Sequence, residues 1–199
     1  HTFFFREIAH FDILRDKALP ELAARARVDR WPRLRVWSAA CSSGEEPYSI
    51  AMTLADHLGT WPWQIEATDI SHRILKTAET AIYDAETVGR MPAPTVRTHF
   101  QRGFGPQAGN YRVKQALRDR VAFHHLNLLE GEPPFTEPFQ VIFCRNVVMY
   151  FSREIASRVI ARCARALAPG GYLFLGHAET LRGLSQAFHL CHTHGTFYY

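Results

Sequence analysis

The chain has 199 residues, which is enough for one substantial hydrophobic core, so we expect a single domain. Its 47% hydrophobic and 21% charged residues are typical of a soluble globular domain. No apolar run approaches the ~20 residues that are needed to cross a bilayer. The net charge of +4 favours an acidic partner, but the basic residues are scattered, which argues against a nucleic-acid ligand.

The four cysteines show neither a CxxC spacing nor a disulfide framework, which is typical of a protein in a reducing cytosol. Cys144 and Cys163 stand among apolar residues, and we predict that they are small core residues. The chain begins with HTFFFREIAHF, which has no signal-peptide pattern, and we expect it to come from a longer cytoplasmic protein. We also expect a monomer that does not insert into a membrane.

Eleven histidines raise the question of a metal site, for which His189, His192 and His194 are the best candidates. On a strand, positions 192 and 194 share one face while position 189 points the other way. Three ligands therefore do not converge, and we predict no metal site.

Apolar runs and helical spacings alternate along the chain. Strands are predicted at residues 33–40, 63–68, 120–127, 139–144 and 172–176. Helices are predicted at residues 45–58, at 71–83 with Ser71 as the N-cap, and at 152–168, closed by Pro169-Gly170-Gly171.

Two further segments depart from this alternation. The region that contains GFGPQAG predicts a small β insertion at about residues 92–119, and residues 188–199 predict a terminal hairpin. The fold class is therefore α/β: a doubly wound, mostly parallel sheet with a terminal antiparallel hairpin and a small β insertion.

The loop at residues 39–46, AACSSGEE, joins the first predicted strand to the first helix. It lacks the GxGxxG pattern that binds a pyrophosphate, and its two acids would repel a phosphate. Glu45 and Glu46 suit a ligand with a cationic end. The alternative is that both acids only stabilise the helix start through the helix dipole.

Asp69 ends the second predicted strand, where an acidic residue in nucleotide-binding sheets accepts hydrogen bonds from ribose hydroxyls. The alternative is a helix cap. Asn127 and Leu128 end the next strand, where an amide or a backbone group could read an adenine edge. An acidic loop together with a ribose acid points to a nucleoside that carries a charged amino acid, and S-adenosylmethionine has this structure.

The stretch FCRNVVMYF at residues 143–151 places Arg145 and Asn146 directly after a buried strand. A charge is costly in that position unless it is paired, and this end of a parallel strand is where ligands bind. Arg145 is therefore a candidate for the site, with Tyr150 close by. The alternatives are that Arg145 pairs with an acid such as Glu179 and that Tyr150 belongs to the core.

Six segments together resemble the chemotaxis receptor methyltransferases, which use S-adenosylmethionine to esterify receptor glutamates. The segments are TFFFRE (2–7), RVWSAACSSGEEPYSIAMTL (35–54), ATDIS (67–71), VAFHHLNLL (121–129), VIFCRNVVMYF (141–151) and LAPGGYLFLGHAET (167–180). The resemblance runs nearly end to end, and the blocks GEEPYS and FCRN are highly specific in combination.

The resemblance implies a role for each matching residue. Glu45 would take the methionyl ammonium and Asp69 the ribose, and Arg145 and Tyr150 would stand at the methyl-transfer site. The remaining residues implied at the cofactor are Thr2, Arg6, Asn127, Leu128 and Asn146, together with Arg145 itself. The family's N-terminal helical domain has no counterpart in this sequence, and the insertion falls where the family carries a small β subdomain.

The predicted reaction is methyl transfer to glutamate side chains in an acidic cytoplasmic region of a methyl-accepting receptor, with S-adenosylhomocysteine as the other product. A glutamate carboxylate is already ionised at neutral pH, so the reaction requires no general base. His177 and Glu179 follow the last parallel strand and could line the acceptor pocket. The alternatives are a non-catalytic module that binds S-adenosylmethionine and a methyltransferase that acts on another acceptor.

Overall fold

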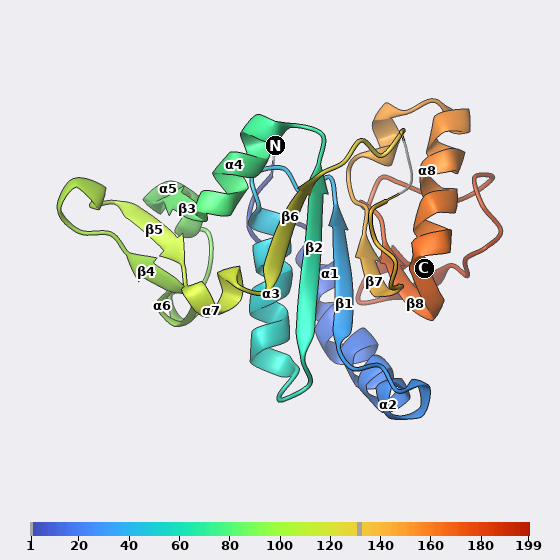
Figure 1. Cartoon of the computed structure of the whole chain (residues 1–199), viewed down its shortest axis with the longest axis horizontal. Coiled ribbons are helices and arrows are strands. Elements are labelled where there is room, and N and C mark those ends of the chain that lie inside the picture. The colour runs from blue at the N-terminus through green and yellow to red at the C-terminus, as the bar shows by residue number, and fades with distance from the viewer. Residues whose placement is uncertain (1, 131–132) are drawn as a thin grey trace.

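A computed structural model describes residues 2–130 and 133–199 of the chain (Figure 1). Its centre is a five-stranded sheet in the order β6-β2-β1-β7-β8, and every neighbouring pair in it is parallel. The strands are β1 (Leu34–Ala39), β2 (Trp63–Asp69), β6 (Val121–His125), β7 (Phe139–Phe143) and β8 (Leu167–Phe174). The prediction of a doubly wound parallel sheet is confirmed, and the strand order reverses beside β1, where such sheets bind ligands.

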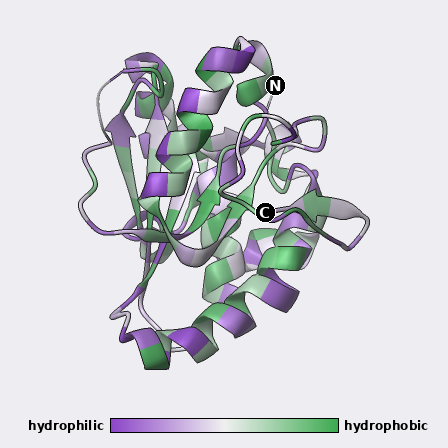
Figure 2. Ribbon diagram, turned by 90° about the vertical axis from the view of Figure 1, so that its right-hand side faces the viewer, coloured by the Kyte–Doolittle hydropathy of each residue, from purple (hydrophilic) through white to green (hydrophobic). Residues whose placement is uncertain are grey.

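Helices cover both faces of the sheet. Successive strand residues point to opposite sides, so each strand contributes residues to two cores. Val36 and Val141 belong to a core covered by the N-terminal helices and by α3 (Glu45–His57). Trp37 and Ile142 belong to a second core under α8 (Arg153–Ala166). Figure 2 shows this as hydrophobic strands enclosed by helices that alternate hydrophobic and hydrophilic turns.

The N-terminal helices form one continuous helical run. This run consists of α1 (Ile8–Ile13), one π-helical turn, η1 (Leu14–Ala18), and α2 (Leu19–Asp29). Leu14, Ala18 and Leu22 are fully buried on the face that packs against the sheet. Among the described residues, no helix is both long and apolar enough to cross a bilayer.

The helix predicted at residues 71–83 is shorter than expected. Helix α4 (His72–Thr80) does begin after Ser71, whose hydroxyl accepts a hydrogen bond from the Ile74 amide at 3.3 Å. It ends at Ala81, which adopts a left-handed conformation with φ of 54°. The prediction was wrong at this end because Tyr83 pairs with a strand and packs on Phe4 instead of continuing the helix.

A small antiparallel sheet in the order β3-β5-β4 stands beside the main sheet (Figure 1). Its strands are β3 (Ile82–Asp84), β4 (Phe100–Arg102) and β5 (Asn110–Val113). The short helices around it are α5 (Ala85–Val88), α6 (Ala93–His99), η2 (Gly105–Gln107) and α7 (Gln115–Arg118). These strands start before residue 92, and the limits of the insertion as a separate subdomain stay a prediction.

The C-terminal hairpin is present as β9 (Cys191–Thr193) and β10 (Thr196–Tyr198). Tyr199 exchanges two backbone hydrogen bonds with Leu173 of β8, which attaches the hairpin to the edge of the main sheet. The prediction that Pro169-Gly170-Gly171 closes the preceding helix was imprecise, because α8 ends at Ala166 and these residues lie within β8. Cys144 and Cys163 are fully buried in the core, as predicted.

Candidate cofactor-binding and active site

A cavity of about 240 Å³ opens at the carboxyl edge of the main sheet. It brings together four predicted site residues: Asp69, Asn127, Leu128 and Tyr150. The rest of its wall is apolar and comes from Ala40 after β1, Ile70 after β2, Leu126 and Leu129 after β6, and Val147 and Phe151 after β7. A larger hollow of about 500 Å³ lies beside the C-terminal hairpin, but it contains none of the predicted site residues.

Asp69 joins two loops at this edge. Its Oδ2 accepts a hydrogen bond from the Ser42 amide at 2.9 Å, and its Oδ1 accepts one from the Ser71 amide at 3.0 Å. The side-chain cap of α4 is Ser71 rather than Asp69. Each carboxylate oxygen has more than one lone pair, so Asp69 keeps the capacity to accept hydrogen bonds from a ligand in the cavity.

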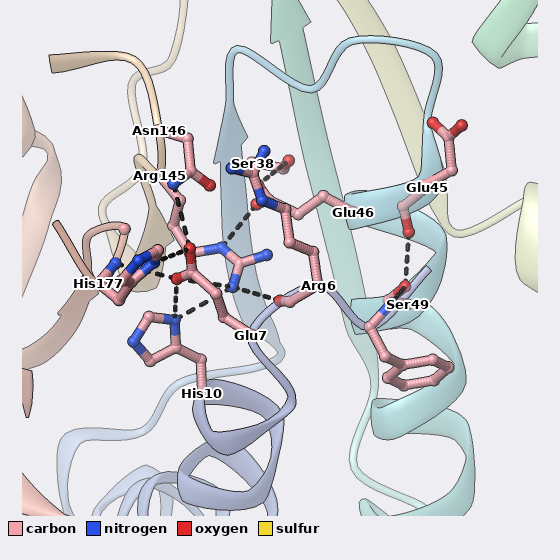
Figure 3. A network of polar contacts seen from close by, with 12 residues as sticks. Arg6, Glu7, His10, Ser38, Glu45, Glu46, Ser49, Arg145, Asn146 and His177 are labelled. Atoms are coloured by element: carbon pink, nitrogen blue, oxygen red, sulfur yellow. Dashed lines mark hydrogen bonds and ion pairs between the residues drawn. The ribbon is translucent and has the colours of Figure 1, made fainter. Parts of the chain in front are cut away.

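Glu45 and Glu46 are adjacent in sequence but lie in different surroundings (Figure 3). Glu45 is 6% exposed and accepts a hydrogen bond from the Ser43 hydroxyl at 2.6 Å. Burial raises the pKa of Glu45, and the bond from Ser43 offsets part of this rise. A buried carboxylate with a raised pKa is a suitable partner for a cationic ligand group, since a cation would relieve the desolvation of its charged form.

The turn before Glu45 depends on a glycine. Gly44 has φ of 97°, and a Cβ at this position would lie 2.8 Å from the Tyr83 hydroxyl. The Tyr83 hydroxyl donates a hydrogen bond to the carbonyl oxygen of Ser43. The small sheet thus packs directly against the loop that presents Glu45.

Arg145 lies at the centre of a buried polar network (Figure 3). Its side chain is 2% exposed, and its Nε donates to Oε2 of Glu46 at 2.8 Å. Its Nη1 donates to the carbonyl oxygen of Arg6 at 2.7 Å and lies 3.8 Å from a carboxylate oxygen of Glu7. The predicted alternative was that Arg145 pairs with Glu179. The Glu179 carboxylate instead accepts hydrogen bonds from the backbone amides of Asn146, Met149 and Gly176.

Glu7 connects the N-terminal segment to the rim of the site. Its Oε1 accepts from Nδ2 of Asn146 at 3.1 Å and lies 2.9 Å from Nδ1 of His177. Burial alone would raise the pKa of Glu7, but the hydrogen bonds from His177 and Asn146 and the charge of Arg145 hold it below its usual value. Glu7 is therefore ionised at neutral pH.

His10 completes the network from α1. It is 1% exposed, and its Nδ1 lies 3.1 Å from Nη1 of Arg145. Burial and the neighbouring Arg145 charge lower the pKa of His10 to about 4. At neutral pH the His10 imidazole beside the Arg145 guanidinium is therefore neutral.

Thr2 and Arg6 lie in the segment that leads into this network. Both are half-buried, and the Phe5 amide anchors the segment by donating to the Ser49 hydroxyl at 2.9 Å. Tyr150 is 79% exposed at the edge of the cavity, so it does not belong to the core. Glu45, Arg145 and Asn146 do not line the cavity but lie beside it, around the start of α3 and the loop after β7.

Sequence reasoning missed Glu7, Glu46 and His10 as partners of Arg145. Glu7 is separated from Asn146 by 139 positions, so no local spacing reveals their contact. Burying Arg145 is costly unless a carboxylate pairs with it. This cost could have pointed to Glu46, which lies in the first turn of the helix that follows β1. For the metal question, the described residues contain no group of three ligands, since His192 packs on Phe197 and His194 pairs with Asp16.

The sheet order, the hairpin on β8 and a carboxyl-edge cavity without a phosphate loop define a doubly wound domain of the S-adenosylmethionine-dependent methyltransferase class. The family model described as "CheR methyltransferase, SAM binding domain" matches residues 1–197. The chain belongs to this family.

Curated relatives carry names that agree with this family. The chain is 44% identical over 191 residues to a chemotaxis protein methyltransferase of Escherichia coli. This match covers 95% of this chain and 64% of that protein. It is 43% identical over 180 residues to chemotaxis protein methyltransferase 2 of Pseudomonas aeruginosa, which covers 89% of this chain and 62% of that protein. The chain therefore spans less than two thirds of the length of these relatives.

Among solved structures, the magnesium protoporphyrin IX methyltransferase of Synechocystis PCC 6803 with bound S-adenosylmethionine is 14% identical to this chain. The match covers 96% of this chain and 77% of that one, with a TM-score of 0.47.

Proposed function

We propose that the chain transfers the methyl group of S-adenosylmethionine to glutamate carboxylates of a chemoreceptor-like protein, giving glutamate methyl esters and S-adenosylhomocysteine. The observation that carries this proposal is the cavity that joins Asp69, Asn127, Leu128 and Tyr150 at the carboxyl edge of the sheet. The family match and the names of the relatives support methyl transfer in chemotaxis.

The cavity suits the adenosine part of the cofactor. Its apolar wall provides surfaces on which a purine ring can stack, and Asp69 and Asn127 provide the polar groups at two strand ends. Asn127 holds its own loop, because its Oδ1 accepts from the Leu129 amide at 3.0 Å. In this proposal Asp69 accepts the ribose hydroxyls, while Asn127 and Leu128 contact the adenine.

Glu45 suits the methionyl ammonium. It lies outside the cavity, at the first turn of α3, where burial raises its pKa. The proposed cofactor would therefore extend from the cavity across the loop after β1 towards α3. Thr2, Arg6 and Asn146 would border it from the N-terminal segment and from the loop after β7.

When bound, the cofactor supplies a methyl group on a positively charged sulfur, and the acceptor is a carboxylate with a pKa of about 4.3. The work of the protein is to orient the acceptor and to exclude water, which raises the effective concentration of the reacting groups. Tyr150 is exposed at the cavity edge, which supports a contact with the acceptor in this proposal.

Arg145 has a supporting role in this proposal. Because Glu46 and Glu7 already balance its charge, Arg145 does not offer an uncompensated cation to an incoming carboxylate. Its described contacts fix Glu46 and the Arg6 carbonyl, so Arg145 orients the N-terminal segment and the start of α3 around the cofactor.

Tritiated methyl transfer tests the proposal. The chain is incubated with methyl-labelled S-adenosylmethionine and the cytoplasmic fragment of a methyl-accepting chemoreceptor, with the full-length E. coli relative as the positive control. We expect labelled protein that releases volatile methanol in mild alkali, because only a carboxyl ester does so. Alkali-stable label would show another acceptor chemistry. Cofactor binding without any transfer would show a binding module, and both results would overturn the proposal.

Calorimetry measures the cofactor separately. We expect micromolar affinity for S-adenosylmethionine, on the order of −8 kcal/mol, with S-adenosylhomocysteine at least as tight. We further propose that the chain acts as a monomer in the cytoplasm on an acidic region of the receptor, which its net charge of +4 favours.

A further inference from the structure

Two loops meet at the rim of the site, and Glu179 holds them together. Its Oε2 accepts the Asn146 amide at 2.7 Å and the Gly176 amide at 2.7 Å, while its Oε1 accepts the Met149 amide at 3.0 Å. The approach is so close that a Cβ on Gly176 would lie 2.3 Å from Nδ2 of Asn146. The residue after Gly176 is therefore fixed next to the loop that carries Tyr150.

That residue is His177, and Glu7 holds it at two points (Figure 3). The His177 amide donates to Oε2 of Glu7 at 3.1 Å, and the ring nitrogen Nδ1 lies 2.9 Å from Oε1 of the same carboxylate. Because Glu7 is ionised, Nδ1 carries the proton in this contact. Both the backbone and the ring of His177 are thus oriented by a single carboxylate.

The His177 side chain nevertheless remains 71% exposed, whereas the side chain of Arg145 is 2% exposed. A receptor segment that approaches from solvent can therefore reach the His177 side chain before it reaches Arg145. An imidazole that is held at Nδ1 by a carboxylate and open at Nε2 donates a hydrogen bond from Nε2 when it is protonated. Such a donor can bind a carboxylate acceptor.

We propose that His177 binds the acceptor glutamate carboxylate through Nε2–H and that Glu7 is the positioning residue that orients the imidazole for this contact. This inference rests on the proposed function and assigns the part of that site that recognises the acceptor. The titratable and charged groups that face His177 are Glu7 on the N-terminal segment, His10 on α1, and Arg145 across the Glu7 carboxylate.

The test uses the variants His177→Ala and Glu7→Gln, their combination, and His57→Ala as the control. His57 is an exposed histidine in the last turn of α3, at the opposite end of that helix from Glu45. The readouts are kcat and KM for the receptor fragment, the Kd of S-adenosylmethionine, and the Kd of the receptor fragment in the presence of S-adenosylhomocysteine.

We expect His177→Ala to raise the receptor KM and Kd about tenfold, since one charge-assisted hydrogen bond is lost, and to leave the cofactor Kd within about twofold. Glu7→Gln should raise the receptor KM similarly, and the double variant should add little beyond His177→Ala.

An unchanged receptor KM and Kd in His177→Ala would overturn this inference while leaving the proposed function intact. The same holds if His177→Ala weakens the cofactor and the receptor equally, because a purely structural role has that signature. If the unmodified chain transfers no alkali-labile methyl group, the proposed function fails, and the inference fails with it. His57→Ala should retain the kinetics of the unmodified chain in every assay.

Discussion

Arg145 and Glu46 form a buried ion pair that ties the loop after β7 to the first turn of α3. The Nε to Oε2 distance is 2.8 Å, and the other oxygen of Glu46 accepts the Ser38 hydroxyl at 2.7 Å. Both carboxylate oxygens of Glu46 are thus paired within the protein, whereas burial raises the pKa of its neighbour Glu45. The two consecutive acids divide their roles: one holds the loop and the other remains for a ligand.

The first prediction follows from this pair. Arg145→Ala removes the guanidinium that pairs with the buried carboxylates of Glu46 and Glu7, so we expect the free energy of unfolding to fall by about 3–5 kcal/mol. Arg145→Lys keeps the charge but carries its donors on a single nitrogen, which cannot span both the Glu46 carboxylate and the Arg6 carbonyl as Nε and Nη1 do; because the charge remains, its loss should be smaller. Urea denaturation measures both changes, with the exposed Arg73→Ala as the control.

This prediction changes how activity data on Arg145 should be read. Lost methyl transfer in Arg145→Ala reports on the reaction only if the variant is folded at the assay temperature. A variant with unaltered unfolding free energy and lost transfer would contradict the structural role and assign Arg145 to direct contact with the acceptor.

The second prediction concerns Asp69. Asp69→Asn removes the carboxylate that is proposed to accept hydrogen bonds from the ribose hydroxyls. We therefore expect the Kd of S-adenosylmethionine to rise about 10- to 100-fold. Asparagine can still accept one of the two amides from Ser42 and Ser71, so the melting temperature should fall only modestly. Calorimetry and thermal unfolding measure the two effects, and an unchanged Kd would remove Asp69 from the site.

The strand ends explain why part of the site could be predicted from the sequence. Asp69, Asn127 and Tyr150 each follow a different parallel strand, and the carboxyl ends of neighbouring parallel strands meet at one edge. The alternation of strands and helices therefore predicted that Asp69 and Asn127 meet at one edge, whereas the role of Tyr150 was implied by the resemblance to the methyltransferase family.

The rest depended on tertiary contacts that no local pattern encodes. The N-terminal segment brings Glu7 to Asn146 and His177 across most of the length of the chain. Ala81 ends α4 in a left-handed conformation because the small sheet recruits Tyr83, although the helical spacing continues through residue 82. In both cases packing between distant segments overrides the local preference.

The third prediction separates the two halves of the cofactor. Glu45→Gln should raise the Kd of S-adenosylmethionine about tenfold, since a charge-assisted contact with the ammonium is lost. The same variant should bind 5′-methylthioadenosine as the unmodified chain does, because that compound lacks the amino-acid end. Asp69→Asn is the matched control, and it should weaken both compounds. Equal weakening of both by Glu45→Gln would contradict the assignment of Glu45.

The fourth prediction concerns the pH dependence of stability. The folded chain holds the pKa of His10 at about 4, while the unfolded chain returns it to its ordinary value of 6.5. Between these values the unfolded state binds a proton that the folded state does not, so the free energy of unfolding falls as the pH falls from about 6.5 to about 4. The shift corresponds to a loss of about 3 kcal/mol.

His10→Gln removes this titration and keeps a polar side chain beside Arg145, so the variant should lose less stability than the unmodified chain over the same pH range. The lowered pKa of Glu7 also reduces stability in acid, because its carboxylate must be protonated as the pH falls through its folded-state pKa. The hydrogen bonds from His177 and Asn146 and the charge of Arg145 keep most of that contribution in both proteins, so the difference between their urea-unfolding curves at pH 7 and pH 4.5 reports mainly on His10 and its contact with Glu7. Parallel losses in the two proteins would show that the His10 imidazole is not buried beside the guanidinium.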